Sequence, residues 1–172
     1  MYVFSIIGKK KSGKSVLTRS IVEGFRAQYE GRMYFLDVVD EYTRIYGFKN
    51  EFKGYPDHEK FLETVKNVKN SLVVFEEAAY YFSSETNGKT KQAIKRFLQT
   101  SRHNNNVVVL IFHSIGDFPS FIYNRIDYLA LFKTNDTPNA LGKLRNNKQF
   151  DECYTSVNEH PSKHYFEVID VT

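Results

Sequence analysis

Residues 6–15, IIGKKKSGKS, combine glycines, lysines and serines at a spacing that suits phosphate binding. Gly8, Gly13, Lys14 and Ser15 match the P-loop pattern G-x-x-x-x-G-K-[ST]. The backbone N–H groups of such a loop point at phosphate oxygens, and the helix that follows adds free N–H groups and a positive dipole. Lys14 reaches the β- and γ-phosphates, and the Ser15 hydroxyl binds Mg²⁺. The motif therefore predicts that ATP and Mg²⁺ bind a nine-residue segment, made of Gly8, Lys9, Lys10, Lys11, Ser12, Gly13, Lys14, Ser15 and Val16.

The three consecutive lysines inside this loop, Lys9, Lys10 and Lys11, have two interpretations. Their positive charges favour binding of the triphosphate, or their side chains simply point to solvent. The sequence favours neither interpretation over the other.

Two carboxylates, Glu76 and Glu77, end the apolar run SLVVF. At a strand tip near a P-loop, one carboxylate holds the magnesium shell and a second orients and deprotonates the attacking water. We assign Glu76 to the metal and Glu77 to the catalytic base, although the metal-side residue is usually Asp. The alternative is a strand that ends in two solvated glutamates.

Apolar runs rich in β-branched and aromatic residues predict the strands that would hold these groups. They are Tyr2–Ile7, Met33–Val39, Ser71–Glu77, Asn106–Ser114, Asp127–Thr134 and His164–Asp170. Helical spacing predicts helices over residues 14–29, 57–70 and 88–103 and a short one after Pro138, whereas residues 41–56 are expected to form a loop. Uniformly apolar strands that alternate with helices are typical of a mostly parallel sheet covered on both faces, with ligands beyond the carboxyl ends of the strands. We predict one α/β domain over residues 1–172, with three layers and the P-loop NTPase fold, a core of about 1–134 and a C-terminal extension of about 135–172.

Composition fits this prediction, because 172 residues with 41% hydrophobic content suffice for one core. The net charge of +4 is compatible with a polyanionic partner. Cys153 is the only cysteine, which excludes an internal disulfide and indicates a reducing compartment. No apolar run approaches the length of a membrane span and no signal segment is visible, so we expect a cytoplasmic protein. His103, His160 and His164 have no metal-ligand spacing with Cys153, and we predict no zinc site.

Two further stretches resemble the FtsK–HerA superfamily of DNA-pumping ATPases. FLDVVDEY (residues 35–42) is similar to the aspartate and EY that end the second strand there, and TSRHNNNVVVLIFHS (residues 100–114) is similar to the region around the fourth strand. An arginine precedes that strand, where this chain has Arg102, and a polar sensor residue, often glutamine, ends it, where this chain has His113 or Ser114. The compact size resembles genome-packaging ATPases of membrane-containing icosahedral viruses. Zot-like assembly ATPases of filamentous phages are also similar, although they typically carry a membrane span after the ATPase domain.

The resemblance implies a DNA-translocating motor, most directly a viral genome-packaging ATPase, that forms a ring, commonly a hexamer, with ATP between subunits. Double-stranded DNA is the expected partner, and viral capsid or membrane proteins are possible further partners. Arg102 would be the finger that acts on a neighbour's ATP, with Arg125 in reserve; the alternative is a surface arginine at a helix end. Lys91 and Lys95 lie with Arg102 on one side of a predicted helix, as a DNA-binding strip or as a solvated face.

Three other functions stay open on the sequence. A nucleotide or small-molecule kinase needs an arginine-bearing lid, which the connections 42–56 and 83–89 do not resemble. A signalling switch needs a base-reading N-K-x-D loop. The stretch KTND at residues 133–136 matches this pattern only loosely, because its residues are in the wrong order and it lies after the fifth strand. A nonviral translocase or secretion ATPase shares the same core.

The aromatic residues at 80–82 either stack on nucleic acid bases or pack in the core, and we prefer the core.

Overall fold

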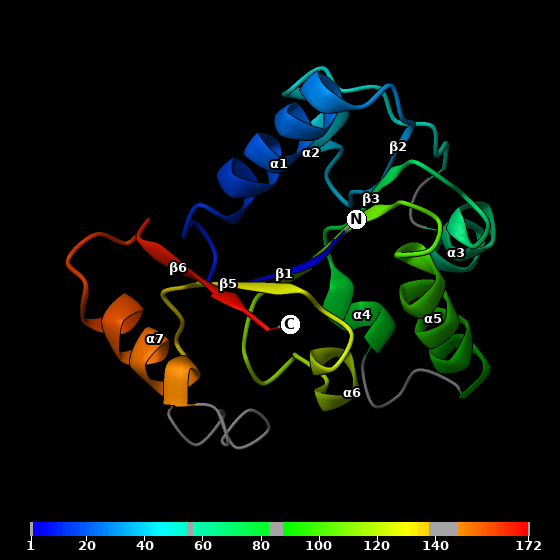
Figure 1. Ribbon diagram of the computed structural model, residues 1–172. Helices are drawn as coiled ribbons and strands as arrows, with labels where there is room; N and C mark the ends of the chain where they lie inside the picture. Colours follow the sequence, from blue (N-terminus) through cyan, green and yellow to red (C-terminus); the bar gives the residue numbers. More distant parts are fainter. Residues whose placement is uncertain (1, 55–56, 83–87, 138–147, 172) are drawn as a thin grey trace.

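A six-stranded sheet runs through the molecule in the order β2-β3-β4-β1-β5-β6 (Figure 1). The computed structural model describes residues 2–54, 57–82, 88–137 and 148–171. The strands are β1 (Val3–Ile7), β2 (Met33–Leu36), β3 (Leu72–Phe75), β4 (Val107–Phe112), β5 (Tyr128–Phe132) and β6 (Phe166–Asp170). The first five are parallel, and β6 pairs antiparallel with β5. The prediction of a mostly parallel α/β sheet is confirmed.

Helices cover both faces of this sheet and make three layers (Figure 1). One face carries α1 (Lys14–Gln28) and α2 (Glu41–Arg44). The other face carries α3 (His58–Val65), α4 (Ala78–Phe82), α5 (Gly88–Ser101), α6 (Ser120–Tyr123) and α7 (Lys148–Glu159). The C-terminal part adds α7 and β6 to this same layered body, since α7 packs on β5 and β6.

Strands β2, β3 and β4 are apolar throughout because both of their faces are buried. Within β3, Val73 and Phe75 belong to the core under α3–α7, while Leu72 and Val74 belong to the core under α1 and α2. All four side chains have no exposed surface. Successive side chains of a strand point to opposite faces, so a strand between two helical layers favours apolar residues at every position.

The residues of the predicted active site follow the ends of their strands, at one edge of the sheet. Ile7 at the end of β1 is in register with Phe112 at the end of β4 and with Leu131 of β5. The segments that follow β1, β3 and β4 therefore meet at the carboxyl edge of the parallel strands. The P-loop, the two glutamates and His113 all lie at this edge.

The predicted element boundaries differ from the structure at several ends. Each strand is shorter than predicted. The helix predicted over residues 57–70 corresponds to α3 and ends at Val65. The expected cap of that helix is present, because the Asp57 side chain accepts a hydrogen bond from Lys60 N at 2.9 Å. The predicted loop at 41–56 begins with a short helix, α2, whose Tyr42 N donates to Asp37 Oδ2 at 2.8 Å. Pro138 and most of the connection 83–89 lie outside the described residues.

Within the described part of the chain, no helix combines the length and the apolar character needed to cross a bilayer.

Candidate active site

The P-loop connects β1 to α1 by a turn that depends on its two glycines. Gly13 has φ +107°, in the left-handed region that favours glycine. A Cβ atom added to Gly8 would lie 2.5 Å from Phe132 Cβ and 2.9 Å from Ser12 Oγ, so only glycine fits there. Phe132 ends β5, the strand beside β1, and it thereby fixes the start of the loop against the sheet.

The loop leaves hydrogen-bond donors free at the start of α1. Gly13 has no side-chain cap, and no described residue accepts from the backbone N–H groups of Gly13, Lys14 or Ser15. The Ser12 hydroxyl is buried and also has no partner among the described residues. Unpaired donors at a helix N-terminus, together with the helix dipole, are the features that bind a phosphate group. The geometry thus fits the predicted phosphate site.

Lys14 points into this loop. Its Nζ donates to Gly8 O at 2.7 Å and to Lys9 O at 3.0 Å, and the residue is only 6% exposed. Burial lowers the pKa of the ammonium group, and the charges of Glu76 and Glu77 act in the opposite direction. A cation held by two carbonyl oxygens inside an anion-binding loop can exchange these partners for phosphate oxygens.

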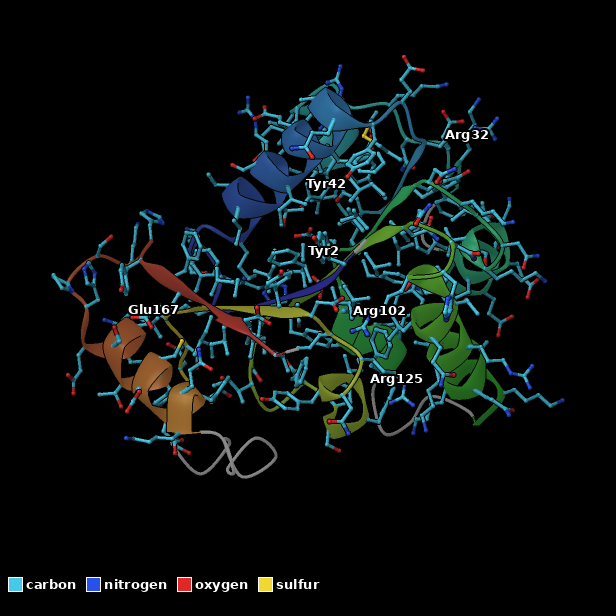
Figure 2. The ribbon with its side chains drawn as sticks, viewed as in Figure 1. Tyr2, Arg32, Tyr42, Arg102, Arg125 and Glu167 are labelled. Carbon is cyan, nitrogen blue, oxygen red and sulfur yellow. The ribbon has the colours of Figure 1, made fainter. Side chains whose placement is uncertain are left out.

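Glu76 lies at the end of β3 and is tied to the α1 side of the sheet. Its Oε2 accepts a hydrogen bond from the Tyr42 hydroxyl at 2.7 Å. Burial raises the pKa of Glu76 to about 7, and the hydrogen bond from Tyr42 opposes this rise. Tyr42 has no exposed surface and stacks on Phe35, with ring centroids 5.0 Å apart (its label lies beside α1 and α2 in Figure 2). The carboxyl group is therefore held in place before any ligand binds.

Glu77 contacts one of the two sensor candidates. Its Oε1 lies 3.2 Å from His113 Nε2 at the end of β4. The other ring nitrogen of His113 is buried and has no partner among the described residues. Ser114 has a different place, because its Oγ accepts from Asp117 N at 3.1 Å and closes a turn. Of the two candidates, the structure brings His113 to the predicted base.

Arg102 lies at the amino edge of the sheet, opposite the P-loop. Its Nη2 is 2.6 Å from Asp127 Oδ1, and Asp127 Oδ2 accepts from Val3 N at 2.7 Å. Val3 begins β1, so this ion pair joins α5 to the starts of β1 and β5. Arg102 therefore does not reach the P-loop of its own chain. Its role on a neighbour's ATP stays a prediction.

Comparisons with known proteins show the family and the fold of this chain. The family model of the zonular occludens toxin (Zot) matches residues 3–163. The chain belongs to the Zot family of P-loop ATPases. No curated protein matches this Zot-family chain.

Solved structures share the fold of the Zot-family chain. The genome packaging NTPase B204 from Sulfolobus turreted icosahedral virus 2, in complex with ATP-gammaS, is 21% identical with a TM-score of 0.77, over 99% of this chain and 92% of that one. B204 from Sulfolobus turreted icosahedral virus, described as a DNA-packaging ATPase, is 20% identical with a TM-score of 0.69, over 99% and 92% of the two chains. The cytoplasmic domain of the type VII secretion ATPase EccC from Thermomonospora curvata is 13% identical with a TM-score of 0.58, over 78% of this chain and 19% of that one. The predicted P-loop NTPase fold and the predicted resemblance to Zot-like ATPases are confirmed.

The basic strip expected on α5 of the Zot-family chain is partly engaged by the protein itself. Lys95 Nζ lies 4.9 Å above the ring of Phe121, and Lys95 and Lys91 are both partly buried. Arg102 follows the end of the helix and pairs with Asp127. The reserve finger, Arg125, donates to Phe121 O beside α6, so Figure 2 labels both arginines in the part of the molecule that holds α5 and α6.

Two other groups of predicted residues, the lysines of the P-loop and the aromatic residues at 80–82, each contain both buried and exposed members. Lys10 and Lys11 are exposed, whereas Lys9 is partly buried. The preference for a core position is right for Tyr81 and Phe82 but wrong for Tyr80, which is 67% exposed. Three successive residues of a helix point about 100° apart, so they cannot all face one core.

Sequence reasoning missed two residues that touch the site. Tyr42 contacts Glu76, and its only signal was the EY similarity on the second strand. His164 contacts the P-loop, because its Nδ1 lies 3.2 Å from Ser12 O. Its position could not be read from the sequence, since it depends on the antiparallel direction of β6.

Proposed function

We propose that the chain hydrolyses ATP with Mg²⁺ and uses the energy to move double-stranded DNA, as a viral genome-packaging motor. The observation that carries the proposal is the meeting of Lys14, Glu76, Glu77 and His113 at one edge of the sheet. In this proposal, Lys14 is the phosphate-binding cation, Glu76 is the metal-binding carboxylate and Glu77 is the base, which His113 contacts. The printed names of the B204 structures, genome packaging NTPase and DNA-packaging ATPase, support the link to DNA.

Phosphate binding falls to the loop and to Lys14. The free N–H groups at the start of α1 donate hydrogen bonds to the β-phosphate, and Lys14 Nζ leaves the carbonyl oxygens of Gly8 and Lys9 for phosphate oxygens. A hydroxyl and a carboxylate are the oxygen ligands that Mg²⁺ prefers, so Ser15 and Glu76 fit a magnesium site. When held there, directly or through water, Mg²⁺ supplies neutralisation of the phosphate charge.

Water activation falls to Glu77. Its Oε1 is held by His113, which leaves Oε2 to accept a proton from the attacking water. The water oxygen then bonds to the γ-phosphorus, the bond from that phosphorus to its bridging oxygen breaks, and ADP leaves. His113 acts as a positioning residue, because it contacts the base rather than the water. Its contact is also sensitive to any movement between the ends of β3 and β4.

The ring and the DNA contacts are part of the proposal. Subunits that place ATP between them would use Arg102, or Arg125, to stabilise transition-state charge on a neighbour's nucleotide. Lys91 and Lys95 would contact DNA phosphates, and the net charge of +4 favours a polyanion. Capsid or membrane proteins would then be further partners, and the host cytoplasm or the virion the place of action.

A second function has a specific observation in its favour. The family match supports a translocase that acts in phage assembly, as expected for Zot-like proteins. The neighbouring genes separate the two functions. A capsid protein gene beside this one supports packaging, and a filamentous coat protein gene supports assembly.

The proposal is tested by ATP hydrolysis and strand displacement on double-stranded DNA. We expect hydrolysis per subunit to rise with protein concentration and with DNA, and added salt to reduce the DNA effect. The wild-type chain should displace a third strand from a DNA triplex in an ATP-dependent manner, and Lys14→Ala should not. Hydrolysis that is indifferent to DNA and to concentration, without displacement, would reject the motor function.

A further inference from the structure

The P-loop follows β1, which lies between β4 on one side and β5 on the other. Glu77 follows β3 and His113 follows β4, and both strands lie on one side of β1, while β5 and β6 lie on the other. The γ-phosphate must lie on the side of Glu77, since that residue activates the attacking water. A triphosphate chain that crosses the loop from this point carries its nucleoside toward β5 and β6.

The segment before β6 comes to that side of the loop (Figure 1). His164 Nδ1 lies 3.2 Å from Ser12 O, and a carbonyl oxygen only accepts, so Nδ1 carries the proton and donates. The same imidazole nitrogen would lie 3.5 Å from a Cβ added to Gly13. A second contact joins β5 to the loop, because Lys9 N donates to Lys133 O at 3.0 Å.

The backbone around His164 is held by several polar and ring contacts. His164 N donates to Ser162 Oγ at 3.2 Å. The next residue, Tyr165, stacks on His160 with ring centroids 3.9 Å apart and donates its hydroxyl to Glu167 Oε1 at 2.9 Å. Figure 2 shows Glu167 beside α7, so the support comes from the C-terminal elements. His164 itself remains exposed and offers a flat ring beside the loop.

The acidic residue that a base-reading loop would use is already engaged elsewhere. Asp136 Oδ2 accepts from Ile115 N at 2.8 Å and from Thr134 Oγ1 at 2.6 Å. These contacts direct the carboxylate back into the protein, toward the segment that follows β4. The KTND stretch therefore does not supply the base contact. Of the two rings that lie beside Gly13, Phe132 is buried, whereas His164 is exposed.

We propose that His164 binds the purine base of the nucleotide by stacking, and so contributes affinity for the nucleoside half of ATP. The family match ends at residue 163, so His164 lies just beyond it. This inference rests on the proposed binding of ATP to the P-loop. The base would lie on the imidazole face, with Ser12 O holding the ring through Nδ1.

Isothermal titration with two ligands tests the proposal on the full chain. ATP carries a base and inorganic tripolyphosphate does not, while both place phosphates in the P-loop. We expect His164→Ala to weaken ATP affinity by about tenfold, the scale of one lost stacking contact, and to leave tripolyphosphate affinity unchanged. His164→Phe keeps a flat ring but loses the hydrogen bond to Ser12 O, so it should lose clearly less ATP affinity than His164→Ala does. His103→Ala, which removes an exposed histidine at the amino edge, is the matched control.

Each other result overturns the proposal. Equal losses for ATP and tripolyphosphate in His164→Ala would show that His164 only supports the shape of the loop. Unchanged ATP affinity, or a loss in His164→Phe as large as in His164→Ala, would remove the base contact. If the wild type binds ATP no better than Lys14→Ala does, the ATP site itself fails, and the base contact fails with it.

Discussion

The hydroxyl of Tyr42 donates a hydrogen bond to Glu76 Oε2 across 2.7 Å, and this contact links α2 to the end of β3. Tyr42 N in turn donates to Asp37 Oδ2 at 2.8 Å, beyond the end of β2. The ends of two neighbouring strands are thus joined through one buried tyrosine. The proposed magnesium ligand owes its position to this residue.

Tyr42→Phe should raise the Mg²⁺ concentration needed for half-maximal hydrolysis by about tenfold or more, with kcat at saturating Mg²⁺ nearly unchanged. The phenylalanine keeps the stack on Phe35 but removes the hydrogen bond that favours ionised Glu76, a contribution of about 1.5–3 kcal/mol to a charged group. Tyr46→Phe is the control, because the Tyr46 hydroxyl donates to Glu41 instead. Identical Mg²⁺ requirements in the two variants would mean that Tyr42 does not position the ligand.

Stability without nucleotide or Mg²⁺ should fall as pH rises through the range set by Glu76. Burial raises the pKa of Glu76 from 4.5 to about 7, so the folded chain binds more protons than the unfolded chain between these values. The contribution of Glu76 is therefore fully present below about pH 4.5 and is lost as pH rises through 7. Denaturant unfolding should show that the stability of the wild type relative to Glu76→Gln decreases by about 2 kcal/mol from pH 5 to pH 8. A difference that is constant with pH would contradict the raised pKa.

Gly8→Ala should destabilise the fold by about 1–3 kcal/mol, the usual cost of overpacking, and should weaken nucleotide binding. The added methyl group would lie 2.5 Å from Phe132 Cβ, so the loop or β5 must shift. Gly24→Ala is the matched control, because a Cβ there has no neighbour within 4 Å and the position is exposed on α1. That variant should be as stable as the wild type or slightly more so, by up to about 1 kcal/mol. Thermal unfolding of the two variants measures the contrast, and equal melting temperatures would argue against the tight packing at Gly8.

Arg102→Ala should destabilise the chain by about 1–2 kcal/mol, a value reduced from that of a buried pair because the arginine is half exposed. The loss leaves the carboxylate of Asp127, which is 5% exposed, with the amide of Val3 as its remaining observed partner. Adding Asp127→Asn should recover part of the stability, since the amide oxygen still accepts from Val3 N. Arg96→Ala, an exposed change on α5, should alter stability by less than about 0.5 kcal/mol.

The same double variant separates stability from a finger role. Arg102→Ala with Asp127→Asn should fold, and if it also binds ATP but hydrolyses it slowly, the finger prediction is supported. Full hydrolysis by assembled subunits of this variant would leave Arg125 as the remaining candidate.

The parts of the site that are local in the chain could be predicted from the sequence. The P-loop occupies one strand, one turn and one helix, so the spacing of Gly8, Gly13 and Lys14 contains its whole geometry. The glutamates follow the strand that ends beside it, and parallel strands bring such ends to one edge. This is why residue types and hydrophobic runs were enough to predict the fold class and the position of the P-loop between β1 and α1.

The remaining contacts depend on how distant segments pack. His164 meets Ser12 across 152 positions of the chain, and only the antiparallel pairing of β6 brings them together. A short strand pattern does not reveal its direction, so no spacing rule places His164. The ion pair of Arg102 likewise depends on the position of Asp127 at the start of β5.

Glu77 is the proposed base for ATP hydrolysis, and single-turnover hydrolysis of ATP by Glu77→Gln tests this role most directly. This substitution keeps the shape of the side chain and removes the base. We expect ATP binding within about twofold of the wild type and hydrolysis slower by at least about 100-fold, the lower range for a lost general base. Glu59→Gln, an exposed change on α3, is the control and should hydrolyse at the wild-type rate. Hydrolysis by Glu77→Gln at the wild-type rate would contradict the role of Glu77 as the base, and the same result together with an inactive Glu76→Gln would reverse the two carboxylate roles.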